Sequence, residues 1–70
     1  MTKDYYKILD INHDADMEEI INSYRRLALR YHPDKCRDPQ SLEKMKEINE
    51  AYSLLKNPIR RLRYDRENKI

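Results

Sequence analysis

One short segment holds the residues best suited to chemistry: His32, Pro33 and Asp34, with Cys36 two positions further on. A histidine near an aspartate can act in acid–base catalysis, but no nucleophile or oxyanion donor is placed to complete such a site. A structural zinc site normally takes four Cys or His ligands. The chain offers only His32, Cys36 and the distant His13. We therefore predict a protein that is not an enzyme and that binds no metal or other cofactor.

The same tripeptide has a structural interpretation. Pro33 fixes its own φ angle, and the Asp34 side chain can hydrogen-bond to nearby backbone, so together they form a stiff polar turn. Such a turn either ends a helix and leaves His32 solvated, or presents His32 to a partner. The residues of the turn alone do not decide between these two interpretations.

Arginines form two groups, which are Arg25, Arg26 and Arg30 in the first half and Arg60, Arg61, Arg63 and Arg66 near the end. Each group is either a solvated face, partly neutralised by neighbouring acidic residues, or a surface for an acidic partner. A small helical nucleic-acid-binding domain using residues 60–66 is the alternative function. The net charge of only +2 and the glutamates at 43, 47 and 50 argue against it.

Composition restricts the class of protein further. Seventy residues form one small domain with a thin core, and the absence of glycine excludes phosphate-binding and dinucleotide-binding glycine loops. A single cysteine cannot form an internal disulfide and fits a reducing compartment. No apolar run approaches the roughly 20 residues that span a bilayer, and the start lacks a signal-peptide core. We expect a monomer without membrane contact, located in the cytoplasm, with the nucleus as a further location.

Two amphipathic helices must position these residues. The first is expected from about residue 16 to 31, and its apolar face is Met17, Ile20, Ile21, Tyr24, Leu27, Ala28 and Tyr31. Its opposite face carries Glu18, Asn22, Arg25, Arg26 and Leu29. The second is expected from about residue 41 to 56, with Met45, Ile48, Ala51, Tyr52 and Leu55 on one face. The exposed Leu29, next to the arginines, is a candidate anchor for a partner.

Shorter helices complete the prediction. Residues 5–9 favour one or two helical turns, and Asn57 followed by Pro58 starts a short basic helix that ends near Arg66. The two long helices should pack as an antiparallel hairpin, with the polar stretch 32–40 exposed at one end. We therefore predict an all-α fold in which short terminal helices cover the open sides of the hairpin.

Four sequence blocks in order resemble the J domain of DnaJ-type co-chaperones over essentially the full chain. They are DYYKIL at 4–9, YRRLALRYHPD at 24–34, INEAYSLL at 48–55 and RRLRYD at 60–65. The resemblance implies a four-helix J fold with helices II and III as the hairpin. It implies one J domain over residues 1–70, the N-terminal module of a longer co-chaperone.

The resemblance also implies a function, which is to bind a DnaK-type (seventy-kilodalton heat-shock) chaperone, stimulate its ATP hydrolysis and so support protein folding. His32, Pro33 and Asp34 would be the tripeptide required for stimulation. Arg25 and Arg26 would meet the acidic surface of the chaperone. Partner contacts are also expected from Leu29 and Lys35. No small-molecule substrate and no nucleic acid are expected as ligands.

Some residues depart from the family pattern. Asp10 stands where a glycine is common, so the turn that leaves the first helix should differ. Met45 replaces a usual phenylalanine, and its flexibility should loosen the packing there. Ile21 and Asn22 occupy positions that are often basic, which thins the positive surface and should weaken partner binding without moving its site.

Overall fold

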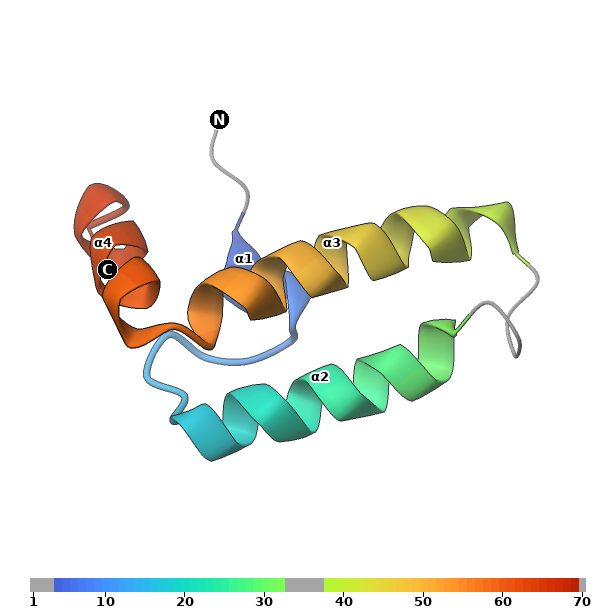
Figure 1. The fold of residues 1–70 in the computed structure, drawn as a ribbon, viewed down its shortest axis with the longest axis horizontal. Coiled ribbons are helices and arrows are strands. Elements are labelled where there is room, and N and C mark those ends of the chain that lie inside the picture. Colours follow the sequence, from blue (N-terminus) through green and yellow to red (C-terminus); the bar gives the residue numbers. More distant parts are fainter. Residues whose placement is uncertain (1–3, 33–37, 70) are drawn as a thin grey trace.

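The structure is a computed structural model of the 70-residue chain and describes residues 4–32 and 38–69. Four α-helices follow one another: α1 (Tyr5–Ile8), α2 (Met17–Tyr31), α3 (Pro39–Leu55) and α4 (Pro58–Glu67). Helices α2 and α3 lie antiparallel, α1 packs on α3, and α4 crosses the end of α3 (Figure 1). The predicted all-α fold with its hairpin is confirmed. None of the described helices is long and apolar enough to cross a membrane.

Every helix begins with a side-chain cap that accepts a hydrogen bond from the first turn of backbone. The four capping residues are Asp4, Asp16, Asp38 and Asn57. The α3 helix starts two residues earlier than the sequence predicted, at Pro39 instead of Ser41. A proline fits the first helical position because its missing N–H has no partner there, and Asp38 caps the backbone just after it.

The core is small and lies where α1, α2, α3 and α4 meet. Its buried apolar members are Tyr6, Leu9, Ala15, Ile20, Ile48, Ala51, Leu55 and Tyr64. Of the apolar stripe predicted on α2, only Ile20 is fully buried, and the others are partly exposed. The reason is that α2 packs mainly on one neighbour, α3, so the edges of its stripe stay near solvent.

Two stacked tyrosines connect α2 and α3 in the middle of the hairpin. The ring of Tyr24 on α2 stacks on that of Tyr52 on α3, with centroids 4.0 Å apart and planes 12° apart. The Tyr24 hydroxyl donates to Oδ1 of Asn49 at 2.9 Å. Stacking and the hydrogen bond fix the rotation of α2 about its own axis, which decides which α2 residues point outward.

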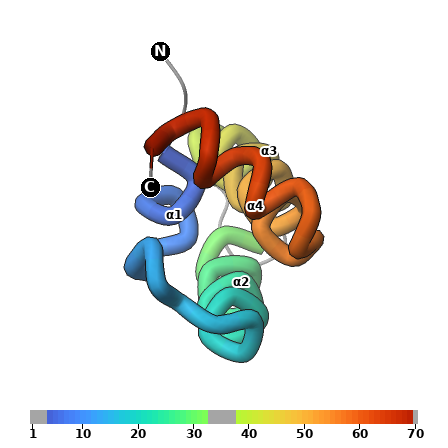
Figure 2. Tube along the Cα trace, turned by 90° about the vertical axis from the view of Figure 1, so that its left-hand side faces the viewer, coloured from blue at the N-terminus to red at the C-terminus, as the bar shows by residue number. Residues whose placement is uncertain are grey.

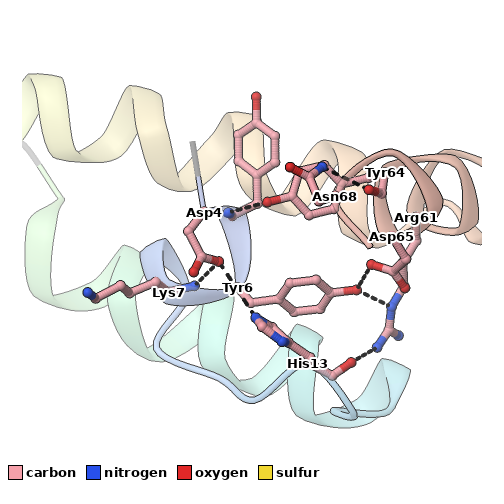
Figure 3. A network of polar contacts seen from close by, with 9 residues as sticks. Asp4, Tyr6, Lys7, His13, Arg61, Tyr64, Asp65 and Asn68 are labelled. Carbon is pink, nitrogen blue, oxygen red and sulfur yellow. Dashed lines mark hydrogen bonds and ion pairs between the residues drawn. The ribbon is translucent and has the colours of Figure 1, made fainter. Parts of the chain in front are cut away.

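Arg61 ties α4 to the start of the chain (Figure 3). Its Nε donates to the Tyr6 hydroxyl at 3.0 Å, and its Nη2 donates to the carbonyls of His13 at 3.3 Å and Ala15 at 2.5 Å. The Tyr6 hydroxyl in turn donates to Oδ1 of Asp65 at 2.5 Å. The α1–α2 connection is therefore held by an arginine about 48 residues away.

The ionisation of two tyrosines reflects these contacts. Burial, followed by the hydrogen bond to Asp65, raises the pKa of Tyr6, while Arg61 acts in the opposite direction. The hydrogen bond to Glu50 is the main cause that raises the pKa of Tyr5. Both phenols therefore keep their protons at neutral pH and can donate to the carboxylates.

The turn after α1 is made by Asp10 with a φ angle of 57°, in the left-handed region that favours glycine. Aspartate is among the non-glycine residues that tolerate this region best. The Asp10 amide donates to the carbonyl of Lys7 at 3.0 Å, and the chain then turns toward α2. An aspartate thus makes this turn in a chain without glycine.

Candidate partner-binding surface

His32 marks the end of α2. It is exposed and caps the helix in an extended conformation, with φ −60° and ψ 133°. A residue that precedes proline is disfavoured in helical conformation, and this explains why α2 stops here, as predicted. Pro33, Asp34 and Lys35 lie outside the described residues, as does Cys36. Of the predicted tripeptide, the structure therefore describes only His32.

Arg25 and Leu29 lie on the outward face of α2. They are four positions apart, so their side chains are neighbours on the helix surface. Both are exposed, and Leu29 keeps 62% of its surface accessible. Beyond them, the guanidinium of Arg30 lies 5.5 Å from the ring centroid of Tyr31. The last two turns of α2 before His32 thus expose both cationic and apolar side chains.

Arg26 is exposed as predicted, but it is also anchored. Its Nη2 donates to Oγ of Ser23 at 3.1 Å, and the Ser23 hydroxyl donates to the carbonyl of Leu9. Arg26 lines an open depression of about 560 Å³ that also includes Lys7 and Asp10. Figure 2 shows α1 and the connection to α2 beside α2. Arg26 therefore lies on the side of α2 that faces α1 and the α1–α2 connection.

Ser23 is a positioning residue that sequence reasoning missed. Its side chain is buried, with 2% of its surface accessible, and its hydroxyl links Arg26 to the end of α1. A signal was present, because Ser23 falls three residues before Arg26 and close to the apolar stripe of α2. The long-range acceptor, the carbonyl of Leu9, was not visible in the sequence pattern.

The described residues of this surface are suited to binding a partner protein. No group of three or more His, Cys, Asp or Glu side chains suited to a metal ion occurs within residues 4–32 and 38–69. The outward end of α2 instead offers an exposed arginine, an exposed leucine and an exposed histidine. Such a surface fits an acidic protein surface with an apolar patch. In the second arginine group, Arg61 is turned inward to Tyr6, so it does not share an outer surface with the exposed Arg63 and Arg66.

Comparisons with known proteins agree with this fold. The family model of the DnaJ domain matches residues 4–65. A chaperone protein DnaJ of Methanosarcina thermophila is 54% identical over 65 residues, which cover 93% of this chain and 17% of that protein. The corresponding protein of Halothermothrix orenii is 55% identical over 65 residues, covering 91% of this chain and 17% of that protein.

A eukaryotic relative is similar to the same degree. DnaJ homolog subfamily B member 5 of Mus musculus is 54% identical over 65 residues, which cover 93% of this chain and 19% of that protein. The chain thus spans less than a fifth of the length of these relatives.

Proposed function

Because the chain belongs to the DnaJ domain family, we propose that it is a co-chaperone module that binds a DnaK-type chaperone and stimulates its ATP hydrolysis. In DnaJ chaperones the J domain is such a module and not itself a catalytic enzyme. The observation that carries the proposal is the exposed His32 at the end of α2, following Arg25 and Leu29 on the outward face. Support for protein folding would follow from the chaperone's own cycle.

Each element of the surface has a physical role in this proposal. Arg25 and Arg26 attract an acidic surface and mainly raise the association rate. Leu29 contributes apolar area at the centre of the contact. The stiff turn that the sequence predicts at His32-Pro33-Asp34 would lower the entropy lost on docking, and the Asp34 carboxylate would pair with an arginine of the chaperone. Stimulation requires that the module bind the activated arrangement of the chaperone more tightly than the resting one.

We expect chaperone binding to depend on a small number of positive charges on α2. Asn22 is exposed and uncharged on the outward face of α2, and Ile21 is partly buried, so neither adds to the positive surface. Arg25, Arg26 and Arg30 on α2, with the predicted contact Lys35, would then provide the cationic contacts. We further propose a monomer that acts in the cytoplasm and uses no cofactor, no nucleic acid and no membrane. The nuclear location has no support from the bacterial and archaeal relatives.

The direct test is single-turnover ATP hydrolysis by DnaK-type chaperones from several compartments, measured with and without this domain. We expect at least one chaperone to hydrolyse ATP about tenfold faster or more, which corresponds to a barrier lowered by about 1.4 kcal/mol. Circular dichroism confirms that the domain is folded under the assay conditions. Unchanged rates for every chaperone, with a folded domain, would contradict the proposal.

Arg25→Ala is expected to weaken association with the chaperone by roughly three- to tenfold without loss of helicity, because the side chain is exposed. Surface plasmon resonance at low and high salt measures the effect, and the difference between variant and parent should shrink as salt rises. Arg66→Ala on α4 is the control, since it removes the same charge from another helix. Equal losses in the two variants would show a nonspecific charge effect and no contact at Arg25.

A further inference from the structure

The outer face of α4 exposes two large apolar residues. Ile59 and Leu62 keep 72% and 62% of their surface accessible. Arg63 and Arg66 are also exposed. These four residues follow the spacing i, i+3, i+4 and i+7, so they share one stripe of the helix. We call this stripe the outer face of α4.

The rest of α4 is occupied by contacts within the domain. Arg61 and Asp65 bind Tyr6, and the Tyr64 ring packs against those of Tyr5 and Tyr6 with centroids 5.1 and 5.9 Å away. The contacts of α4 with other helices are with α3 and α1, and it lies across the end of the hairpin (Figures 1 and 2). The outer face is therefore the side of α4 that the domain itself does not use.

The face is a shallow depression and not a flat surface. A volume of about 360 Å³ is lined by Ile59, Leu62, Arg63, Arg66 and Glu67. An isolated exposed leucine is common on protein surfaces, but two large apolar residues one turn apart in a depression form a contiguous patch. Two arginines border this patch. An occupant must therefore bring apolar side chains at helical spacing and negative charges beside them.

We propose that the outer face of α4 binds a short acidic amphipathic helix of a partner protein, separate from the chaperone-binding surface. The partner helix would place apolar side chains over Ile59 and Leu62, and its Asp or Glu residues would pair with Arg63 and Arg66. We choose an acidic partner because its negative charges would complement Arg63 and Arg66. It is a mode of helix recognition through anchors one turn apart.

Other occupants fit less well. A second copy in a symmetric contact would bring Arg63 and Arg66 of both chains together, and like charges at a contact oppose association. A lipid surface is bound by amphipathic helices with an extensive apolar face, whereas α4 exposes only two large apolar residues, Ile59 and Leu62. Nucleic acid would meet apolar side chains in the middle of the face and Glu67 at its edge.

The two surfaces lie on different helices. The proposed chaperone-binding residues Arg25 and Leu29 lie on α2, whereas α4 crosses the opposite end of the hairpin from His32 (Figure 1). Both partners can then bind one domain at the same time. The inference does not depend on the proposed function, and either can fail without the other.

The test uses fluorescence anisotropy with a labelled synthetic peptide of about 14 residues. Its leucines are spaced i, i+3, i+4 and i+7, and glutamates occupy the flanking positions. We expect saturable binding in the micromolar range that weakens as salt is raised from about 50 to 500 mM. Leu62→Ala in the domain should weaken binding about tenfold, and Arg63→Glu combined with Arg66→Glu should abolish it.

Leu29→Ala is the matched control, because Leu29 also keeps 62% of its surface accessible and also lies near arginines. We expect this variant to bind the peptide as the parent does, while Leu62→Ala keeps full stimulation of the chaperone. Thermal melting shows that all variants are folded. A peptide with the same composition and scrambled leucine spacing should bind at least about tenfold more weakly.

Four results would overturn the proposal. The first is a loss of peptide binding in Leu29→Ala but not in Leu62→Ala. The second is absence of saturable binding, and the third is Leu62-dependent binding to phosphatidylserine vesicles without binding to the peptide. The fourth is self-association of the parent in sedimentation equilibrium that Leu62→Ala removes, because a second copy would then be the occupant.

Discussion

His32→Gln is expected to abolish the stimulation of ATP hydrolysis and to leave the fold intact. His32 is exposed at the C-terminal cap of α2, so its imidazole contributes no apolar area to the core. Glutamine keeps hydrogen-bonding capacity but lacks the planar ring that would be presented to the chaperone beside Pro33 and Asp34. Single-turnover hydrolysis should return to the unstimulated rate, a loss of about tenfold or more.

His13→Gln is the matched control, because it makes the same change at the other histidine of the chain. The His13 ring lies edge-on to Tyr6, and its Nε2 is 4.0 Å from the Asp4 carboxylate, with both side chains half-exposed. This variant should stimulate the chaperone as the parent does. The assay is run at increasing domain concentration. If His32→Gln regained full stimulation at saturation, His32 would contribute to affinity and not to the coupling with hydrolysis.

Helix positions were predictable from local signals. The caps Asp16 and Asn57, and the stop before Pro33, each act on the backbone within three residues of themselves. The start of α3 differs from the sequence prediction because Pro39 belongs to the polar stretch 32–40, which the pattern predicts to be a loop. A proline is compatible with both a loop and a first helical turn, and only the cap at Asp38 decides between them.

The site was predictable only in part. The outward position of Arg25 and Leu29 follows from helical periodicity, which the packing of α2 on α3 preserves. Periodicity cannot separate Arg25 from Arg26, however, because the anchor of Arg26 is Ser23, whose own partner is the Leu9 carbonyl. The inward turn of Arg61 was hidden for the same reason, since its acceptors belong to α1 and to residues 13 and 15.

These long-range hydrogen bonds contribute to holding the helices in position, because the apolar core is small. Only Ile20 of the predicted α2 stripe is completely shielded, while the stacked Tyr24 and Tyr52 are partly exposed. The orientation of the proposed chaperone-binding face therefore depends on a few buried side chains together with the Tyr24–Asn49 and Arg61–Tyr6 hydrogen bonds. Loss of one buried anchor should then have a large effect on the whole domain.

Ile20→Ala tests this dependence and is expected to lower the free energy of unfolding by about 2–5 kcal/mol, since it removes a fully buried side chain and leaves a cavity. A core of this size rarely provides more than about 3–5 kcal/mol in total. The variant should therefore be largely unfolded near physiological temperature. Urea denaturation followed by circular dichroism measures the change.

Ile59→Ala is the control, because the same substitution on α4 affects a side chain that is 72% accessible. Its cost should stay within about 0.5 kcal/mol. Comparable losses in the two variants would contradict the assignment of Ile20 as the α2 anchor. A stable Ile20→Ala variant would place the main stabilisation elsewhere, in the α3 and α4 contacts with α1. A large loss at Ile20 alone would show that its packing in the core holds α2, and with it the proposed chaperone-binding face, in place.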